Sequence, residues 1–277
     1  MHANANLTVR PGVIPMPKFK DTVGKRGVYV LPSLFTTMGL FSGFYSLVAS
    51  IQGNFEVAAW AILAAAVFDM LDGRVARLLH AETDFGAEYD SLCDMLSFGV
   101  APAVLVYLWA LVNLPAELHR LAWLGGFFVV AGAALRLARF NVRHDVQDHR
   151  YFQGLPTPGA ALFIATAVLY YVDIHTEPQP WLWLALSVFL SWLMVSNVRF
   201  ISGKDVDLQK RHSSKMLVVM IVAVGFLAVE PYRMPFAILF AYCMHGPMLS
   251  VWQKWKLSQY RAKRRQRKSA SKTDDVA

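Results

Sequence analysis

The sequence predicts an all-α integral membrane protein with about eight transmembrane helices. Of its 277 residues, 56% are hydrophobic and 17% are charged, and the mean hydropathy is +0.38, which is too apolar for an ordinary soluble domain. The apolar residues gather in runs close to the ~20 residues that span a hydrocarbon core. The basic residues fall between these runs almost entirely on one side, as the positive-inside rule expects.

Each apolar run is predicted to be one helix. The first must act as its own insertion signal, because residues 1–29 are polar, contain three prolines and lack the apolar core of a cleavable signal peptide. The second run finishes and the third starts around a loop at 80–87, and a polar loop containing Pro156 leads into the fifth. The predicted spans cover 30–50, 56–79, 89–112, 121–140, 158–174, 181–198, 216–230 and 234–252.

The Lys and Arg residues orient the bundle. With eight spans and both chain ends in the cytoplasm, every basic residue except Arg120 and Arg233 lies in a cytoplasmic segment. The net charge of +8 comes largely from the tail at 261–268. We interpret this tail as a topology signal with a solvated end, and attraction to anionic lipid headgroups is the alternative. No nucleic-acid-binding module is found.

Four aspartates stand out in this apolar chain. Asp69 and Asp72 are three residues apart and Asp90 and Asp94 are four apart, so each pair projects from one face of a helix. Both pairs lie at adjoining ends of the second and third spans, at the cytoplasmic surface. Any one of them could be a helix cap or a snorkelling group, but an intramembrane carboxylate costs about 2.5–3.5 kcal/mol on insertion scales. Four at fixed intervals therefore favour a cage for Mg²⁺, Mn²⁺ or Ca²⁺, and with it phosphate chemistry at a membrane.

The aspartates belong to a longer pattern of acidic, small and basic residues. It reads Asp69-x2-Asp72-Gly73-x2-Ala76-Arg77-x8-Gly86-x3-Asp90-x3-Asp94. The pattern resembles the signature of the CDP-alcohol phosphatidyltransferase family, whose members are membrane enzymes that transfer a phosphoryl-alcohol group from a CDP-activated donor to an acceptor hydroxyl. Every position of that signature is filled.

The resemblance implies a role for each aspartate. Asp69, Asp72 and Asp90 would hold divalent metal, expected to be two Mg²⁺ or Mn²⁺ ions that compensate the charge of the diphosphate. Asp94 would accept the proton of the acceptor hydroxyl and also touch a metal. The resemblance further implies a six-helix core, followed here by two C-terminal helices, and a homodimer.

The remaining signature positions are expected to bind the CDP-lipid. Gly73, Ala76 and Gly86 have little or no side chain, which lets a nucleotide or phosphate approach the backbone, and packing between helices is the alternative for each. Arg77 can hold a phosphate or pair with an aspartate of the signature, with snorkelling as its alternative.

Four further segments resemble one branch of the family, the bacterial phosphatidylserine synthases. They are Leu-Pro-Ser-Leu-Phe-Thr at 31–36, Ser-Phe-Gly-Val-Ala-Pro-Ala at 97–103, Arg-Leu-Ala-Arg-Phe-Asn at 136–141 and Tyr-Phe-Gln-Gly-Leu-Pro-Thr-Pro at 151–158. This likeness implies CDP-diacylglycerol as the donor, L-serine as the acceptor and a bacterial inner membrane as the location.

Within these segments, polar and basic residues are candidates for binding the substrates. Ser33 and Thr36 are expected to contact the CDP-lipid, although many members of the family carry Asn at the position of Ser33. Arg136 or Arg139 could pair with the carboxylate of serine, and Gln153 could line the same mouth. The alternatives are positive-inside placement for the arginines and an ordinary turn for Gln153.

The sequence thus divides into a cytoplasmic segment at 1–29, a catalytic transmembrane core at 30–199, a loop with two helices at 200–253 and a basic, disordered tail at 254–277. Two other functions are left open. A related enzyme could use glycerol 3-phosphate or inositol as its acceptor. A cation transporter would also place carboxylates in a membrane, but it gives no reason for the glycine, alanine and arginine of the signature.

Overall fold

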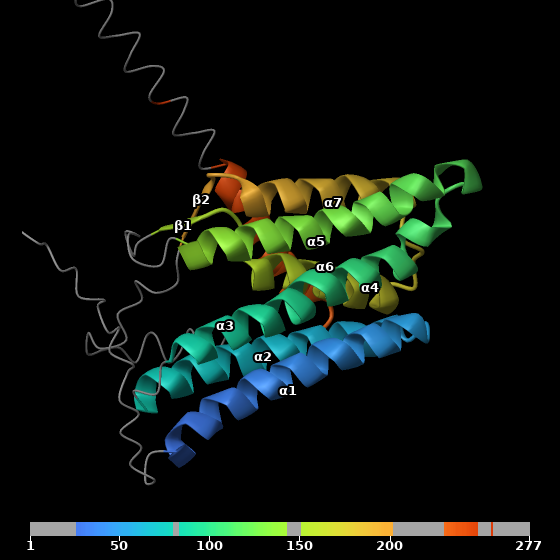
Figure 1. The fold of residues 1–277 in the computed structure, drawn as a ribbon. Coiled ribbons are helices and arrows are strands. Elements are labelled where there is room, and N and C mark those ends of the chain that lie inside the picture. Colours follow the sequence, from blue (N-terminus) through green and yellow to red (C-terminus); the bar gives the residue numbers. More distant parts are fainter. Residues whose placement is uncertain (1–25, 80–82, 143–150, 202–229, 249–255, 257–277) are drawn as a thin grey trace, which may run out of the picture.

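A computed structural model describes residues 26–79, 83–142, 151–201, 230–248 and 256. Within these ranges the chain forms a bundle of apolar helices and one short pair of strands (Figure 1). The elements are α1 (Arg26–Ile51), α2 (Phe55–Leu79), α3 (Asp84–Asp94), the π-helix η2 (Met95–Val100), α4 (Ala101–Trp109), the short 3₁₀-helices η3 (Leu111–Asn113) and η4 (Ala116–Leu118), α5 (His119–Val142), β1 (Tyr151–Gln153), α6 (Thr157–Asp173), α7 (Pro180–Val195), β2 (Arg199–Ile201) and a helix over residues 233–248.

The prediction of an all-α protein with helices that can cross a membrane is confirmed, but the predicted number of eight spans is not. Three stretches, Pro32–Ile51, Asp84–Asn113 and Ala116–Val142, are long and apolar enough to cross a membrane. The apolar helices α6 and α7 are shorter, with 17 and 16 residues, so each is roughly 24–26 Å long against a hydrocarbon core of about 30 Å. The span predicted at 216–230 lies outside the described residues.

The loop expected at 80–87 is shorter than predicted, because α3 begins at Asp84. Thr83 has extended backbone angles and caps the helix: its Oγ1 accepts a hydrogen bond of 3.0 Å from the backbone N–H of Gly86. Gly86 therefore lies in the first turn of α3. The cap was not recognised in the sequence because Thr83 lies in a polar stretch that also suits a loop.

The helices α1 and α2 form a hairpin, seen as the lower pair in Figure 1. Gly53 makes the turn between them with a φ of +78°, which glycine adopts without strain. Gly39 of α1 lies against Ala65 of α2, and a Cβ on Gly39 would be in ordinary contact with the Ala65 carbonyl oxygen, 3.7 Å away. This close packing brings α1 beside the half of α2 that carries the first two aspartates.

The segments α3, η2 and α4 follow one another without a break, and the π-helix lies directly after Asp94. Pro102 has no N–H to donate to the carbonyl of Phe98, so the regular hydrogen-bond ladder is already interrupted here. In its place the N–H of Ala101 donates to Leu96, five residues earlier. The resulting segment packs tightly on α1, where the Ser97 hydroxyl donates to the Gly39 carbonyl at 3.2 Å.

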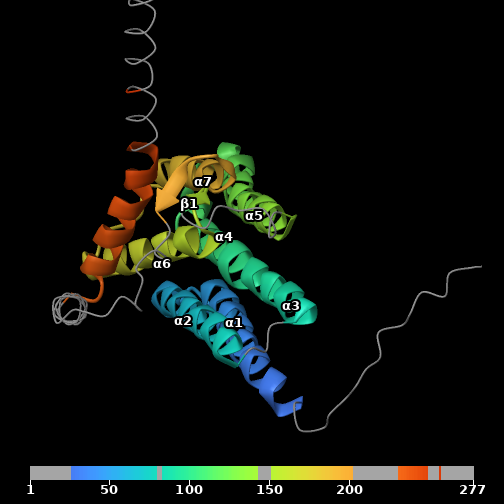
Figure 2. The ribbon, with the colours of Figure 1, turned by 90° about the vertical axis from the view of Figure 1, so that its left-hand side faces the viewer.

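The rest of the core lies between α4, α5, α6 and α7. Trp109, Tyr171 and Trp183 pack edge to face, with ring centroids 5.0–5.9 Å apart. Figure 2 shows the helix over residues 233–248 beside α6, and Phe236 of this helix lies 5.6 Å from Phe163 between ring centroids. The large side chains of this core do not surround the aspartates. The site is formed instead by the neighbouring ends of α1, α2 and α3.

Candidate metal and phosphate site

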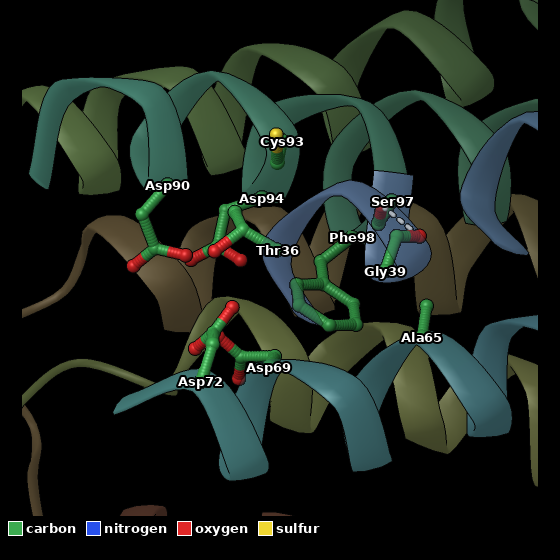
Figure 3. Close-up of a pocket in the computed structure, with 10 residues that line it drawn as sticks. All are labelled: Thr36, Gly39, Ala65, Asp69, Asp72, Asp90, Cys93, Asp94, Ser97 and Phe98. Carbon is green, nitrogen blue, oxygen red and sulfur yellow. Dashed lines mark hydrogen bonds between the residues drawn. The ribbon is translucent and has the colours of Figure 1, made fainter. Parts of the chain in front are cut away.

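A small cavity lies between α1, α2 and α3 and is lined by all four aspartates (Figure 3). Asp69 and Asp72 reach it from α2, and Asp90 and Asp94 reach it from α3 on the opposite side. Thr36 of α1 completes the wall between them. The structure thus brings together two pairs that are separated by about twenty residues of sequence, because the chain reverses direction between α2 and α3 and both helices face the same cavity.

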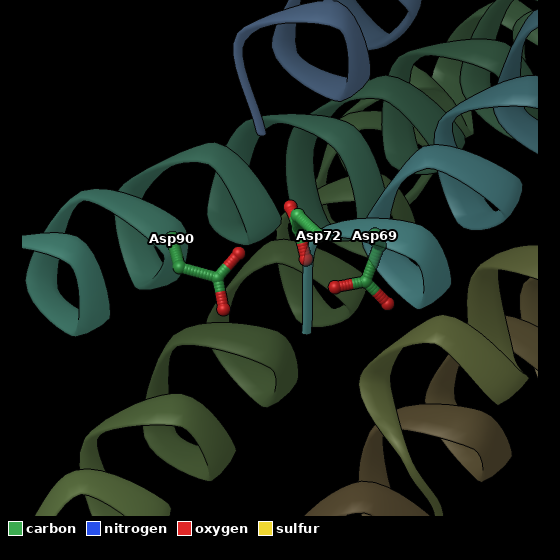
Figure 4. A group of neighbouring side chains, drawn as sticks. All are labelled: Asp69, Asp72 and Asp90. Carbon is green, nitrogen blue, oxygen red and sulfur yellow. The ribbon is translucent and has the colours of Figure 1, made fainter. Parts of the chain in front are cut away.

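Three of the carboxylates form a compact group (Figure 4). One oxygen from each of Asp69, Asp72 and Asp90 lies within 4.8 Å of the others. The Asp72 side chain is only 5% exposed, and its Oδ2 is buried without a hydrogen-bond partner among the described residues. A buried, unpartnered carboxylate oxygen is costly, and so is the repulsion among three carboxylates at this distance.

A divalent cation would remove both costs. None of the described residues that line the cavity is basic, so no side chain there neutralises the carboxylates. Three hard oxygen donors at this spacing suit Mg²⁺ or Mn²⁺, which are commonly bound through a few carboxylates together with water and substrate phosphates. The residues present therefore fit the metal site that the sequence predicts.

Asp94 belongs to the same cavity but is not part of the compact group of three. It lies one turn beyond Asp90 on α3 and points into the same space (Figure 3). Fully buried Phe98 closes the inner side. The cavity holds only about 10 Å³, close to the space of one water molecule, so a nucleotide can bind only across its mouth.

At that mouth, α2 presents bare backbone beside a cation. A Cβ on Gly73 would stand 3.7 Å from Nη1 and 3.8 Å from Nη2 of Arg77, so the guanidinium lies over the glycine that follows Asp72. The Arg77 side chain is exposed, whereas Gly73 and Ala76 are half-buried. An arginine beside glycine backbone and next to a carboxylate of the cavity is well placed for a phosphate group.

The candidates on α1 and α3 lie around the same opening. Buried Thr36 lines the cavity, with its hydroxyl donating to the Pro32 carbonyl at 3.2 Å, and half-buried Ser33 lies one turn earlier on α1. Gly86 has a structural reason to be small, because a Cβ there would approach the capping oxygen of Thr83 to 3.1 Å.

Asp90 is held in place by its two sequence neighbours. Thr37 of α1 donates its hydroxyl proton to the Ser33 carbonyl at 2.7 Å, so the Tyr89 hydroxyl, 3.1 Å away, donates to Thr37. On the other side, the amide of Asn141 at the end of α5 donates to the Ser91 hydroxyl at 3.0 Å. Residues 89 and 91 thus attach α3 to two different helices, with Asp90 between them.

These contacts were not predicted from the sequence. Asn141 and Ser97 fall in segments that the sequence singled out, but with no role assigned to them, and nothing local distinguishes Thr37, Tyr89 or Ser91. Their significance comes from hydrogen bonds between residues 50 and 52 positions apart.

The residues predicted to bind serine lie outside the small cavity. The guanidinium of Arg139 donates to the Val195 carbonyl at 3.1 Å and to the side-chain oxygen of Asn197, so it holds the end of α7 against α5. Arg136 is half-buried one turn earlier on α5. Gln153 lies in β1, opposite Arg199 of β2.

The loop between β1 and α6 explains part of the segment at 151–158. Gly154 has a φ of +81°, and a Cβ there would lie 3.0 Å from the Ser196 carbonyl oxygen. Its N–H donates to Val198 at 2.8 Å, and the N–H of Leu155 donates to Leu193 at 3.0 Å. Only glycine fits this position, and the loop docks on the end of α7 beside Arg139.

Comparisons with known proteins agree with the chemistry of the site. A family model described as CDP-alcohol phosphatidyltransferase matches residues 29–176, which include all four aspartates. A CDP-diacylglycerol–serine O-phosphatidyltransferase from Helicobacter pylori is 33% identical over 225 residues, which cover 79% of this chain and 90% of the relative.

Two further relatives extend the likeness to other lineages. An enzyme with the same name from Mycobacterium bovis is 29% identical over 245 residues, covering 84% of this chain and 82% of the relative. An archaetidylserine synthase from Methanothermobacter thermautotrophicus is 35% identical over 176 residues, covering 61% of this chain and 69% of the relative.

Proposed function

The chain belongs to the CDP-alcohol phosphatidyltransferase family, and we propose that it transfers the phosphatidyl group of CDP-diacylglycerol to the hydroxyl of L-serine, giving phosphatidylserine and CMP. It is accordingly a transferase of phospholipid biosynthesis. The observation that carries the proposal is the cavity into which two helices bring four aspartates, one of which has a buried oxygen without a hydrogen-bond partner in the described part of the chain. The serine-using names of relatives from bacteria and an archaeon support the choice of acceptor.

Asp69, Asp72 and Asp90 are proposed to hold divalent metal, Mg²⁺ or Mn²⁺, with Asp94 as a further ligand where two ions are bound. The metal would neutralise the diphosphate oxygens of the donor and polarise the phosphorus that is attacked. Gly73, Ala76, Arg77 and Gly86, with Ser33 and Thr36, are proposed to receive the CDP-lipid across the mouth of the cavity.

Asp94 is proposed as the general base. It faces the same space as the group of three carboxylates but stands outside it, which suits a carboxylate that must exchange a proton. Asp94 takes the proton of the serine hydroxyl, and the serine oxygen bonds to the phosphorus that carries diacylglycerol. The bond from that phosphorus to the bridging oxygen breaks, and CMP leaves with the electron pair.

We propose that the carboxylate of serine is bound by an arginine near the end of α5, Arg136 or Arg139. Arg139 already holds the end of α7. It would therefore also assist serine binding indirectly, by positioning the loop between β1 and α6 that docks on the end of α7. Gln153 lies in the strand that precedes the docked loop and is proposed to line the same mouth. An arginine fork matches a carboxylate with two parallel hydrogen bonds.

The finer membrane arrangement is also a proposal. Six helices of the core and two C-terminal helices would give eight spans, with the aspartates and both termini on the cytoplasmic side of a bacterial inner membrane. The basic residues on one side of the predicted spans support this orientation. A homodimer is proposed from the family resemblance.

The test is CMP release from CDP-diacylglycerol by the detergent-purified protein, with L-serine, glycerol 3-phosphate and inositol compared as acceptors and Mn²⁺ or Mg²⁺ added or chelated. The expected result is release that requires both serine and metal. Release with another acceptor would overturn the choice of serine but retain the site. Absence of release with any acceptor, together with metal uptake into liposomes, would favour a cation transporter instead.

A further inference from the structure

A second and much larger cavity lies at the opposite end of the bundle from the aspartates. It is formed where α2 begins and where α4 and α6 end, at the right-hand side of Figure 1. Its volume is about 550 Å³, within the range of about 300–1,000 Å³ that is usual for small-molecule sites. Its walls include Phe55, Trp109, Asn113, Tyr171 and Glu177.

The electrostatics of this end favour a cation. Glu177 is the only carboxylate among the described residues that line the cavity, and no Lys or Arg lines it. Both α4 and α6 end at the cavity, so each directs the partial negative charge of a helix C-terminus toward it. The structure describes two arginines at this end, Arg120 and Arg233, and Arg233 is bound to Asp173 at 2.6 Å.

The walls add aromatic surface suited to an organic cation. Trp109 and Tyr171 pack edge to face, with ring centroids 5.4 Å apart, and Phe55, the first residue of α2, lines the same cavity. Organic ammonium groups are attracted to the faces of such rings, the more strongly where a carboxylate lies nearby. An anionic ligand would be repelled by the same carboxylate and helix ends.

The rim that carries Glu177 is held in an unusual conformation. His175 has a φ of +49°, in the left-handed region that non-glycine residues seldom adopt. The turn is closed by N–H groups of His175 and Thr176, which donate to Val172 and Tyr171 at 3.2 Å. This turn folds the chain back across the end of α6 and places Glu177 in the wall of the cavity.

From the volume, charge and aromatic walls together, we propose that this cavity binds an organic ammonium group, with Glu177 as its counter-ion and Trp109 and Tyr171 as its aromatic wall. The ammonium can come from the headgroup of an amine-bearing membrane lipid or from a small free amine. The site is separate from the aspartate cavity, so the inference does not depend on the proposed phosphatidyl transfer.

The proposal is tested by native mass spectrometry of the full chain in detergent, titrated with short-chain phosphatidylethanolamine and with phosphatidylglycerol of the same chains. We expect phosphatidylethanolamine to bind more tightly, and Glu177→Gln to weaken its binding about fivefold. Glu117→Gln is the matched control, because Glu117 is exposed in η4 at the same end but does not line the cavity. This control should leave the affinity unchanged.

A second variant and a competition complete the test. Thr176→Arg places a cation in the wall and should abolish the preference for phosphatidylethanolamine, while CMP release with serine stays unchanged in both cavity variants. Excess ethanolamine that displaces the lipid would support recognition of the ammonium alone, and failure to displace it would support a lipid headgroup. Equal binding of the two lipids, or equal losses in Glu177→Gln and Glu117→Gln, would overturn the proposal.

Discussion

Replacing Gly43 by alanine tests the tight contact between α1 and η2 beside the aspartate cavity. A Cβ at Gly43 would lie 2.8 Å from Cα and 2.9 Å from Cβ of Ser97, where ordinary contact begins at 3.4 Å. Because Cα is backbone, the two segments must separate by about 0.6 Å. Overpacking of this kind costs about 1–3 kcal/mol, against a gain of about 0.5–1 kcal/mol from replacing a helical glycine.

The matched control is Gly39→Ala, one turn earlier on α1. Gly39 lines the aspartate cavity, so only the thermal stability of this variant is compared. Its Cβ would find Ala65 and Phe68 atoms at 3.7 Å, which is ordinary contact, so the glycine effect alone should leave the protein equally or slightly more stable. Thermal unfolding in detergent measures both variants. We expect the midpoint of Gly43→Ala to fall by several degrees while that of Gly39→Ala does not.

The same substitution should reach the site. Separation of α1 from η2 stretches the 3.2 Å hydrogen bond from Ser97 to the Gly39 carbonyl and moves Thr36 away from the aspartates of α3. The Mn²⁺ concentration for half-maximal CMP release should therefore rise in Gly43→Ala. An unchanged unfolding midpoint and an unchanged metal requirement would refute the idea that this contact sets the position of α1.

Three further predictions concern the site itself. Asp94→Asn should abolish CMP release while binding of CDP-diacylglycerol is largely retained, and full activity in this variant would exclude Asp94 as the base. Asn141→Ala removes the hydrogen bond to Ser91 and should raise the Mn²⁺ requirement several-fold with little change in the KM for serine; a merely structural role would lower the yield of folded protein instead. Metal should stabilise the protein, by about 2.7 kcal/mol at 100 times its Kd, and Asp72→Asn should largely remove the metal-dependent rise in unfolding midpoint that chelation reverses in the parent protein.

The helices and the aspartates could be predicted because their signals are local. A run of apolar residues marks a helix wherever it packs, and spacings of three and four place Asp69 with Asp72 and Asp90 with Asp94 on common faces before any tertiary structure is known. The helix start at Asp84 was missed by a few residues, since the Thr83 cap lies in a polar stretch that also suits a loop.

What could not be predicted depends on the partner a side chain finds. From the sequence, Arg139 is predicted to be a candidate for binding serine. In the structure its guanidinium donates a hydrogen bond to the end of α7, a contact that the sequence does not indicate. The roles of Tyr89 and Ser91 likewise appear only once α1 and α5 are placed on either side of α3. Hydrogen bonds over 50 or more residues leave no periodic trace in a sequence, so a resemblance can name such residues but cannot say what they contact.

The π-helix after Asp94 shows how residues without chemistry of their own shape the site. Pro102 cannot donate a backbone hydrogen bond, so one bond of the regular helix is already missing at this point. The wider turn of η2 therefore costs one hydrogen bond less here than it would elsewhere in a helix. Within this turn Ser97 meets the Gly39 carbonyl and Phe98 fills the inner wall of the cavity with 1% of its surface exposed. Both contacts need the close approach that Gly43 permits on α1. The segment at 97–103 is therefore best understood as the support that holds α3 against α1, and so brings Asp90 and Asp94 to the aspartates of α2.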